Sequence, residues 1–179
     1  MKTICIDPGH GGADPGAVNG KYHEADAALA IALIIGDTLK NWGYQVVYTR
    51  TENTTLKLSD RTNTANNAGA DLFVSIHLNS FSDATANGIE TLVHGNAAPL
   101  AKELAKTVQE ALCGATGWKD RGVQVRNDLY VLKHTRMPAI LVETGFISNP
   151  EECAKLFDTE NWQKMIALQI ANAISEVLD

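Results

Sequence analysis

Short hydrophobic runs alternate along the chain with longer segments in which apolar residues recur at helical spacing. The short runs are rich in Ile, Val, Leu and Phe and predict buried β-strands. The strands are expected at 3–6, 45–49, 72–77, 88–94, 129–132 and 139–143. The longer segments predict amphipathic helices, several of them followed by glycine. The helices are expected at 24–42, 59–68, 98–112 and 160–178. The stretch 114–128 carries neither pattern and is expected to be an irregular loop.

The order strand, helix, strand, helix, strand at the start of the chain predicts parallel strands joined by right-handed crossovers. We therefore expect an α/β fold, with a three-layer, mostly parallel sheet of about six strands and helices on both faces. The 179 residues contain no linker or internal repeat, so residues 1–179 are expected to form a single domain. In such sheets, functional sites gather beyond the carboxyl ends of the strands.

Composition excludes some functions. The chain is 45% hydrophobic and carries a net charge of −6, which argues against nucleic acid as the main partner. No apolar run approaches the roughly 20 residues of a membrane span, so we expect no membrane insertion. No signal-peptide pattern precedes the first strand, which fits a mature or excised domain or a cytoplasmic product. Cys5, Cys113 and Cys153 are too widely spaced to indicate a disulfide framework.

Two histidines follow predicted strands. His10 comes after an apolar run that ends in Asp-Pro-Gly, and His77 is the polar exit of the run Leu-Phe-Val-Ser-Ile. Imidazoles at two strand ends indicate a metal site, and a catalytic metal of this kind takes a third His or carboxylate ligand. Glu24 starts the helix that follows the His10 loop and could reach a metal held there. Its alternative role is to favour the helix dipole from the first turn.

Other polar residues are candidates for catalysis or substrate binding. Glu143 closes a buried apolar run, so partial desolvation should raise its pKa and suit it to act as a general base; a solvated strand-end carboxylate is the alternative. Asn79 lies two residues after His77 and could orient substrate. The loop 114–128, with Lys119, Arg121 and Arg126, could form a wall of the substrate groove or be an ordinary polar crossover.

Several short sequence motifs follow one another along almost the whole chain. They include IDPGHGG at 6–12, YTR at 48–50, LSDR at 58–61 and ADLFVSIHLN at 70–79. The segments 24–32, 88–90 and 138–149 complete the set. Jointly, these motifs resemble the zinc-dependent N-acetylmuramoyl-L-alanine amidases of the amidase-3 family, found in bacterial autolysins and phage endolysins.

The resemblance implies that His10, Glu24 and His77 bind one catalytic Zn²⁺ and that Glu143 is the catalytic carboxylate. It implies peptidoglycan as the partner, with hydrolysis of the amide between the lactyl group of N-acetylmuramic acid and L-alanine. The family commonly has Lys where this chain has Ala25, and His23 could compete as a ligand. The family motif places a carboxylate at this position, which favours Glu24 over His23 as the ligand. Arg50 and Arg61 match family positions and are expected to tie loops together.

Two rival functions remain open from the sequence. The first is a zinc peptidase that cuts within the stem peptide, and the second is an inactive wall-binding module. We expect a monomer that is secreted to the cell wall as an autolysin; a phage endolysin made in the cytoplasm is the alternative.

Overall fold

A six-stranded sheet forms the centre of the protein, in the order β4-β1-β5-β8-β6-β7. We describe it from a computed structural model covering residues 1–158 and 160–178. The strands are β1 (Thr3–Pro8), β4 (Gln45–Tyr48), β5 (Leu72–Asn79), β6 (Ile89–Val93), β7 (Asp120–Val125) and β8 (Ala139–Phe146). Strands β4, β1, β5 and β8 are parallel, whereas β6 is antiparallel to β8 and parallel to β7. The mostly parallel sheet confirms the predicted α/β fold.

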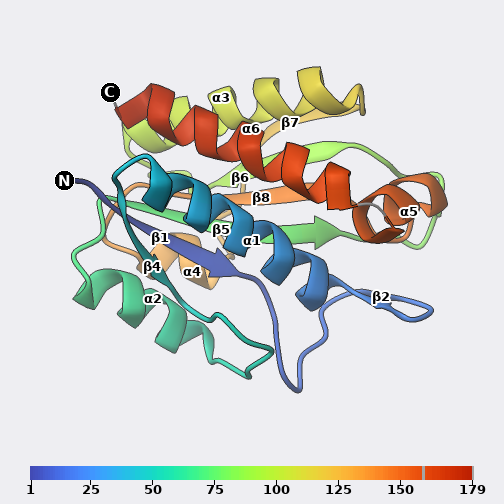
Figure 1. The fold of residues 1–179 in the computed structure, drawn as a ribbon, viewed down its shortest axis with the longest axis horizontal. Helices are drawn as coiled ribbons and strands as arrows, with labels where there is room; N and C mark the ends of the chain where they lie inside the picture. Colours follow the sequence, from blue (N-terminus) through green and yellow to red (C-terminus); the bar gives the residue numbers. More distant parts are fainter. Residues whose placement is uncertain (159, 179) are drawn as a thin grey trace.

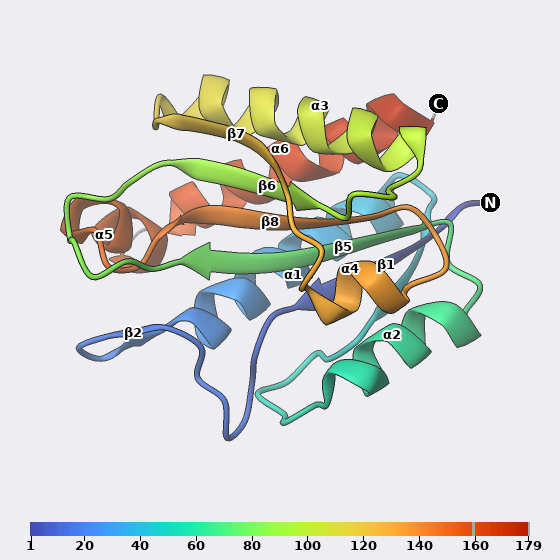
Figure 2. The same cartoon turned by 180° about the vertical axis from the view of Figure 1, so that it is seen from behind.

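Helices cover the two faces of the sheet unequally. Helices α1 (Glu24–Asn41), α3 (Pro99–Thr116) and α6 (Glu160–Leu178) pack together over one face (Figure 1). The other face carries the shorter α2 (Leu58–Asn67) and α4 (Tyr130–His134). Figure 2 shows these two helices near β1 and the start of β5, with much of β8 and β6 left open. Within the described residues, no helix is long and apolar enough to cross a membrane.

Alternation along the strands sends neighbouring side chains to opposite faces. Val74 and Ile76 of β5 join the larger core beneath α1, α3 and α6. Phe73 of β5 and Leu141 of β8 join the smaller core beneath α2 and α4. His77 and Glu143 lie an even number of residues further along the same strands. They therefore point to the thinly covered face, where a substrate has access to the sheet.

The structure corrects the sequence prediction in two places. Residues 129–132 were expected to form a strand, but helix α4 begins at Tyr130 and buries Val131 and Leu132 against the smaller core. Four consecutive apolar residues cannot distinguish a short helix from a strand. The stretch 114–128 was expected to be irregular, yet it contains β7. This strand pairs with β6 alone in the described sheet and is largely exposed, so it lacks the apolar signature of a central strand.

Two small elements were not anticipated. Strands β2 (Val18–Asn19) and β3 (Tyr22–His23) form a hairpin between β1 and α1. Helix α5 (Pro150–Asp158) follows β8, and the side chain of Asn149 accepts hydrogen bonds from the backbone N–H groups of Glu151 and Glu152 at 3.0 and 3.2 Å. An Asn followed by Pro is a recognisable helix start, so this element was detectable in the sequence.

Candidate active site

The loop that carries His10 is held by two buried arginines. His10 has a φ of 57°, a left-handed backbone conformation that costs a non-glycine residue about 1–3 kcal/mol. Arg50 donates hydrogen bonds from Nε to the Pro8 carbonyl at 3.0 Å and from Nη2 to the Gly9 carbonyl at 2.6 Å. Arg61 donates from Nη1 to the Pro8 carbonyl at 2.6 Å and from Nη2 to the His10 carbonyl at 2.5 Å. Both arginines therefore tie loops together, as expected from the sequence.

A buried carboxylate anchors one of these arginines. Asp7 Oδ1 accepts a hydrogen bond from Arg61 Nη1 at 2.8 Å and another from Thr49 Oγ1 at 2.5 Å. The other oxygen, Oδ2, accepts a hydrogen bond from Ser75 Oγ at 2.6 Å. A buried ion pair whose remaining lone pairs are also bonded offsets much of its desolvation cost. The network fixes β1 against β4 and β5 directly below the His10 loop.

Three side chains from three elements meet above this network. Glu24, at the first turn of α1, is buried and places Oε1 3.2 Å from His10 Nε2 and 2.9 Å from His77 Nδ1. The backbone N–H of Leu78 donates to Oε1 at 3.0 Å, and that of Ala17 donates to Oε2 at 2.9 Å. One ligand atom from each of His10, Glu24 and His77 lies within 4.8 Å of the others. This group could hold a metal ion.

Neighbours orient the two imidazoles. Asp14 Oδ2 lies 2.8 Å from His10 Nδ1, so it fixes the ring with Nε2 toward Glu24. Such a carboxylate partner typically sets the tautomer of a metal-ligating histidine. Gly9 leaves room for the His77 ring, because a Cβ at this position would overlap the imidazole. Gly16 has a φ of 68°, and a Cβ there would lie 2.6 Å from Glu24 Oε2 and 2.7 Å from His10 Cδ2.

Opposite charges favour the close approach of Glu24 and the two imidazoles. Burial by itself would raise the pKa of Glu24, but hydrogen bonds from His10 and His77, and their charges, hold that pKa below its ordinary value. Burial would lower the pKa of His10, but hydrogen bonds to Glu24 and Asp14 and their negative charges raise it to about 9.

His23, which the sequence left as a competing ligand, lies outside this group. Its side chain is half-exposed, with Nδ1 3.7 Å from Asp26 Oδ2. The adjacent Glu24 points inward because the first turn of α1 rests on the site. The geometry thus brings together the three ligands predicted from the sequence.

Glu143 lies beside His77 in the sheet. The two residues are register partners between β5 and β8, and Glu143 is also the register partner of Glu90 on β6. Glu143 Oε2 is buried, and no hydrogen-bond donor reaches it from the described residues. Burial raises the pKa of Glu143 to about 7; the charge of His77 opposes this shift, whereas the charges of Glu24 and Glu90 add to it. A carboxyl group that titrates near neutrality can accept and return a proton.

The two candidate substrate-binding residues lie apart from the metal ligands. Asn79 donates from Nδ2 to Glu90 Oε2 at 3.2 Å, two residues beyond His77 on β5. Arg126 follows β7, and its guanidinium donates to both carboxylate oxygens of Asp128 at 2.9 and 2.8 Å. Its side chain is 47% exposed. The contact of either residue with substrate stays a prediction.

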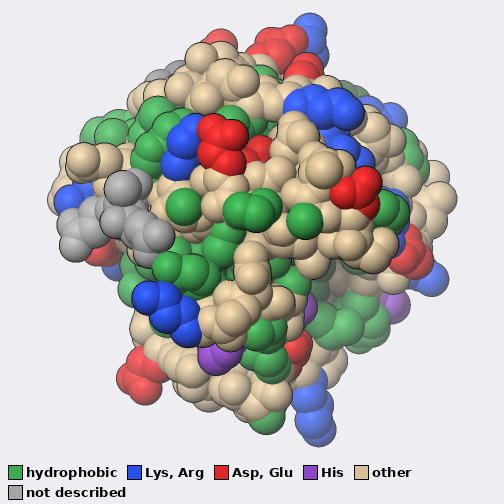
Figure 3. Space-filling model, turned by 90° about the vertical axis from the view of Figure 1, so that its right-hand side faces the viewer, with side chains coloured by type: hydrophobic (Ala, Val, Ile, Leu, Met, Phe, Trp, Pro, Cys, Tyr) green, Lys and Arg blue, Asp and Glu red, His purple; other side chains and the backbone are tan. Residues whose placement is uncertain are grey.

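The surface around the site is open and mixed in charge. A cavity of about 520 Å³ adjoins the ligands His10 and His77 and is lined in part by Leu58, Tyr130 and Leu141. Figure 3 looks onto the right-hand side of Figure 1, where β5 ends. It shows acidic and basic side chains interspersed with hydrophobic ones on that face. The site thus sits in a shallow, partly apolar surface that a large substrate can reach.

The particular roles of three supporting residues were not identified from the sequence, although Glu90 was expected to be structural. Asp14 orients His10, Gly9 makes space for His77, and Glu90 lies next to Glu143. A carboxylate four residues after a candidate ligand in a glycine-rich loop was a usable signal for Asp14. The role of Glu90 depends on strand order, which places β6 next to β8 although the two are far apart in sequence.

Comparison with known proteins gives a consistent result. The sequence model of the amidase-3 family, described as N-acetylmuramoyl-L-alanine amidase, matches residues 4–176. The Bacillus subtilis protein YqiI is 38% identical over 179 residues, covering 99% of this chain and 85% of YqiI. The N-acetylmuramoyl-L-alanine amidase LytC of Bacillus subtilis is 40% identical over 87% of this chain, which corresponds to 31% of LytC.

A solved structure agrees with the sequence relatives. The catalytic domain of CwlV, an N-acetylmuramoyl-L-alanine amidase from Bacillus (Paenibacillus) polymyxa var. colistinus, superimposes with a TM-score of 0.94 at 40% identity. The match covers 100% of this chain and 99% of that one. The similarity therefore extends over the whole sheet and its helices as well as the ligand-bearing loops.

Proposed function

Because the chain belongs to the N-acetylmuramoyl-L-alanine amidase family of peptidoglycan hydrolases, we propose which bond it cuts and how. The bond is the amide between the lactyl group of N-acetylmuramic acid and the L-alanine of the stem peptide. One observation carries this proposal: the group His10, Glu24 and His77 lies next to Glu143, whose Oε2 has no hydrogen-bond partner among the described residues.

The donor set fits a catalytic zinc ion. Two imidazoles and one carboxylate, with a position left for water, are a common ligand set for hydrolytic zinc. Glu24 Oε1 lies 3.2 Å from His10 Nε2 and 2.9 Å from His77 Nδ1, so His10, Glu24 and His77 would hold the ion together. When bound, zinc lowers the pKa of its water toward about 7 and polarises the amide carbonyl.

The chain's own residues perform the proton transfers and the positioning. Glu143 accepts the proton of the attacking water on its free carboxylate oxygen and returns it to the departing alanine nitrogen. A pKa of about 7 suits both steps, because the carboxyl group is poised between its two protonation states near neutral pH. Asp14 keeps the His10 ring oriented, and Arg50 and Arg61 hold the strained loop that presents it.

Matched variants test this assignment. Glu143→Gln should retain about one equivalent of zinc but lose activity on purified peptidoglycan by a factor of about 100 or more, since the general base is removed. His10→Ala should lose both zinc and activity. Glu110→Gln makes the same chemical change on an exposed part of α3 and should behave as the unmodified protein. Turnover by Glu143→Gln at the rate of the unmodified protein would show that another group acts as the base.

Product analysis identifies the bond. Mass spectrometry should find released peptides with N-terminal L-alanine and glycan strands left intact. Peptides cut within the stem would instead indicate a zinc peptidase. Binding of the protein to cell wall without any loss of turbidity would indicate a wall-binding module with a disabled site.

We further propose that the protein acts outside the cytoplasmic membrane as a monomeric, secreted autolysin, since its substrate lies there. Immunodetection in the wall and culture-fluid fractions of the producing cell tests this location. Release only on phage-induced lysis would favour a phage endolysin. Light scattering of the purified protein tests the monomeric state.

A further inference from the structure

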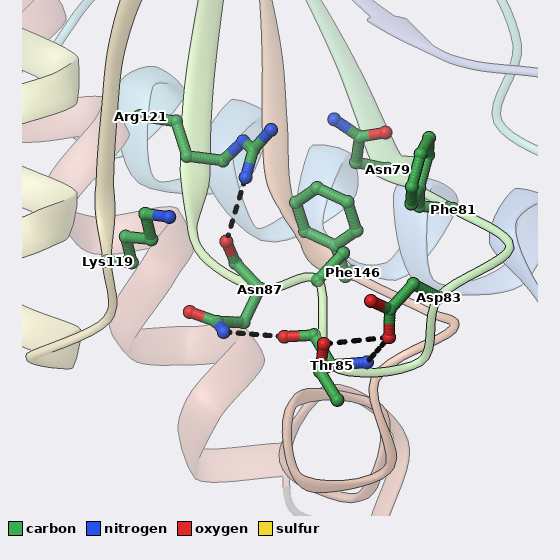
Figure 4. A pocket seen from close by; sticks show the side chains of 9 residues that line it. Asn79, Phe81, Asp83, Thr85, Asn87, Lys119, Arg121 and Phe146 are labelled. Atoms are coloured by element: carbon green, nitrogen blue, oxygen red, sulfur yellow. Dashed lines mark hydrogen bonds between the residues drawn. The ribbon is translucent and has the colours of Figure 1, made fainter.

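A second pocket opens at the ends of β5 and β8, further along these strands than His77 and Glu143. It encloses about 330 Å³ and is lined by Asn79 of β5, Phe146 of β8, Arg121 of β7 and the loop after β5. Figure 4 shows the guanidinium of Arg121 and the ring of Phe146 on its wall, with Asn79 and Phe81 on the opposite side. The mechanism above assigns no role to this pocket.

The guanidinium of Arg121 lines the pocket and makes few hydrogen bonds to the described residues. Its Cζ lies 4.9 Å from the centre of the Phe146 ring, which holds the group in a cation–π contact. Nε is buried and faces Glu90 Oε1 at 3.9 Å, beyond hydrogen-bond distance. Within the described residues, the hydrogen bond of this guanidinium is a long one, 3.4 Å from Nη1 to the Asn87 carbonyl. The terminal N–H groups of the Arg121 guanidinium are therefore available to a ligand.

The pocket offers an anion two cations, Arg121 and Lys119. Their charge is partly balanced by Asp83 in the wall and by Glu90, which forms a long ion pair with Arg121 Nε at 3.9 Å. The Asp83 carboxylate is already engaged, since it accepts hydrogen bonds from the backbone N–H and the hydroxyl of Thr85 at 2.8 and 2.7 Å. A planar guanidinium matches a carboxylate in a bidentate arrangement better than an ammonium does.

The pocket lies at peptide distance from the reacting centre. Phe146, on which Arg121 rests, is three residues beyond Glu143 on β8. A bulge pairs Phe146 with Asn79, which is only two residues beyond His77, so the advance along the sheet is about 7 Å. Two extended peptide residues also span about 7 Å. A stem peptide whose amide nitrogen lies at Glu143 therefore reaches Arg121 with a carboxylate close to its N-terminal alanine.

We propose that this pocket is a subsite for a free carboxylate of the departing stem peptide, and that Arg121 determines specificity for it. This subsite rests on the proposed amidase function. It adds that the stem peptide extends from the metal group along β8 toward Arg121. It also predicts that the protein cleaves cell walls with this free carboxylate faster than cell walls without it. The second stem residue, a glutamate joined through its side chain, carries a free carboxylate in some walls and a carboxamide in others.

Two synthetic substrates that differ in this one group provide the test. Both are muramoyl peptides, one with the free carboxylate and one with the carboxamide at the second stem residue. The unmodified, zinc-loaded protein should show a kcat/KM about tenfold or more higher for the carboxylate, because a charge-assisted hydrogen bond is lost with the amide. Arg121→Gln should bring this ratio close to one. Arg121→Lys should give an intermediate ratio, since it keeps the charge and loses the planar fork.

Arg136→Gln is the matched control, because Arg136 is exposed and precedes β8 at the opposite end of that strand. It should leave the ratio unchanged. Equal rates of the unmodified protein on both substrates, or an unchanged preference in Arg121→Gln, would overturn the subsite. The ratio compares two substrates on one protein sample, so partial unfolding of a variant does not alter it.

A binding measurement separates this inference from the amidase function itself. Calorimetric titration with the free product peptide, as carboxylate and as carboxamide, requires no turnover. Tighter binding of the carboxylate that disappears in Arg121→Gln would support the subsite even if neither substrate is cleaved. Equal affinity of the unmodified protein for both peptides would refute it.

Discussion

Replacing Glu143 with Gln should make chelator-treated protein progressively more stable, relative to the unmodified protein, as the pH rises. In the folded state, burial raises the pKa of this carboxyl group from its ordinary value of 4.5 to about 7. The unfolded chain therefore releases the proton more readily than the folded chain. Folding stability is lost as the pH rises from about 4.5 to about 7, and the penalty is complete above that range.

The size of the pKa shift of Glu143 determines how much folding stability is lost. A difference of one pKa unit corresponds to 1.36 kcal/mol, so ionisation of Glu143 costs about 1 kcal/mol of folding stability at about pH 5 and about 3 kcal/mol at about pH 8.5. The amide introduced by Glu143→Gln does not ionise and escapes this cost. The stability of Glu143→Gln relative to the unmodified protein should therefore increase by about 2 kcal/mol between these pH values.

Urea denaturation of chelator-treated protein at both pH values measures the change. The comparison between pH values cancels any constant cost of placing an amide in the pocket. Glu110→Gln is the matched control, since it makes the same chemical change on an exposed part of α3 and should leave the dependence of stability on pH unchanged. A difference between Glu143→Gln and the unmodified protein that stays constant with pH, or falls as pH rises, would refute the reasoning.

Three further perturbations probe the support of the site. Gly9→Ala should reduce zinc content and activity together, because the new Cβ would displace the His77 ring; unchanged zinc content would contradict this packing argument. Arg61→Met should lower the free energy of unfolding by about 3–5 kcal/mol in a urea titration, since Asp7 is left buried without its ion-pair partner. Zinc at about 1,000 times its Kd should stabilise the unmodified protein by about 4 kcal/mol in thermal unfolding. This gain should vanish on adding a chelator and be absent in His10→Ala.

The ligands could be predicted from sequence because their placement depends on local rules. His10 and His77 each follow a buried run, and parallel strands bring their carboxyl ends to one edge of a sheet. Glu24 begins the helix that leads back over that edge. In this sheet β1 and β5 are neighbours, so the three residues meet at one edge.

The other half of the site depends on long-range pairing and was less predictable. Strand β7 is an exposed edge strand whose polar residues conceal its pairing with β6. Because β6 lies between β7 and β8, Arg121 reaches across to Phe146, which is 25 positions away in the sequence. The sequence placed Arg121 only on a loop that could line the groove. Its contact with the end of β8 requires the strand order.

Glu24 and Glu143 illustrate how one site gives two carboxylates different roles. Burial would raise the pKa of Glu24, but hydrogen bonds from His10 and His77 and their charges lower it, so Glu24 stays ionised, as its proposed role as a ligand requires. Glu143 is partly exposed, but its Oε2 is buried and has no partner among the described residues; desolvation raises its pKa, so it can carry a proton. Environments that separate the pKa values of two nearby acids in this way assign the ligand and the base. The same unpartnered oxygen that suits Glu143 to proton transfer is also the source of the stability penalty at alkaline pH, so catalysis and stability are opposed at this one side chain.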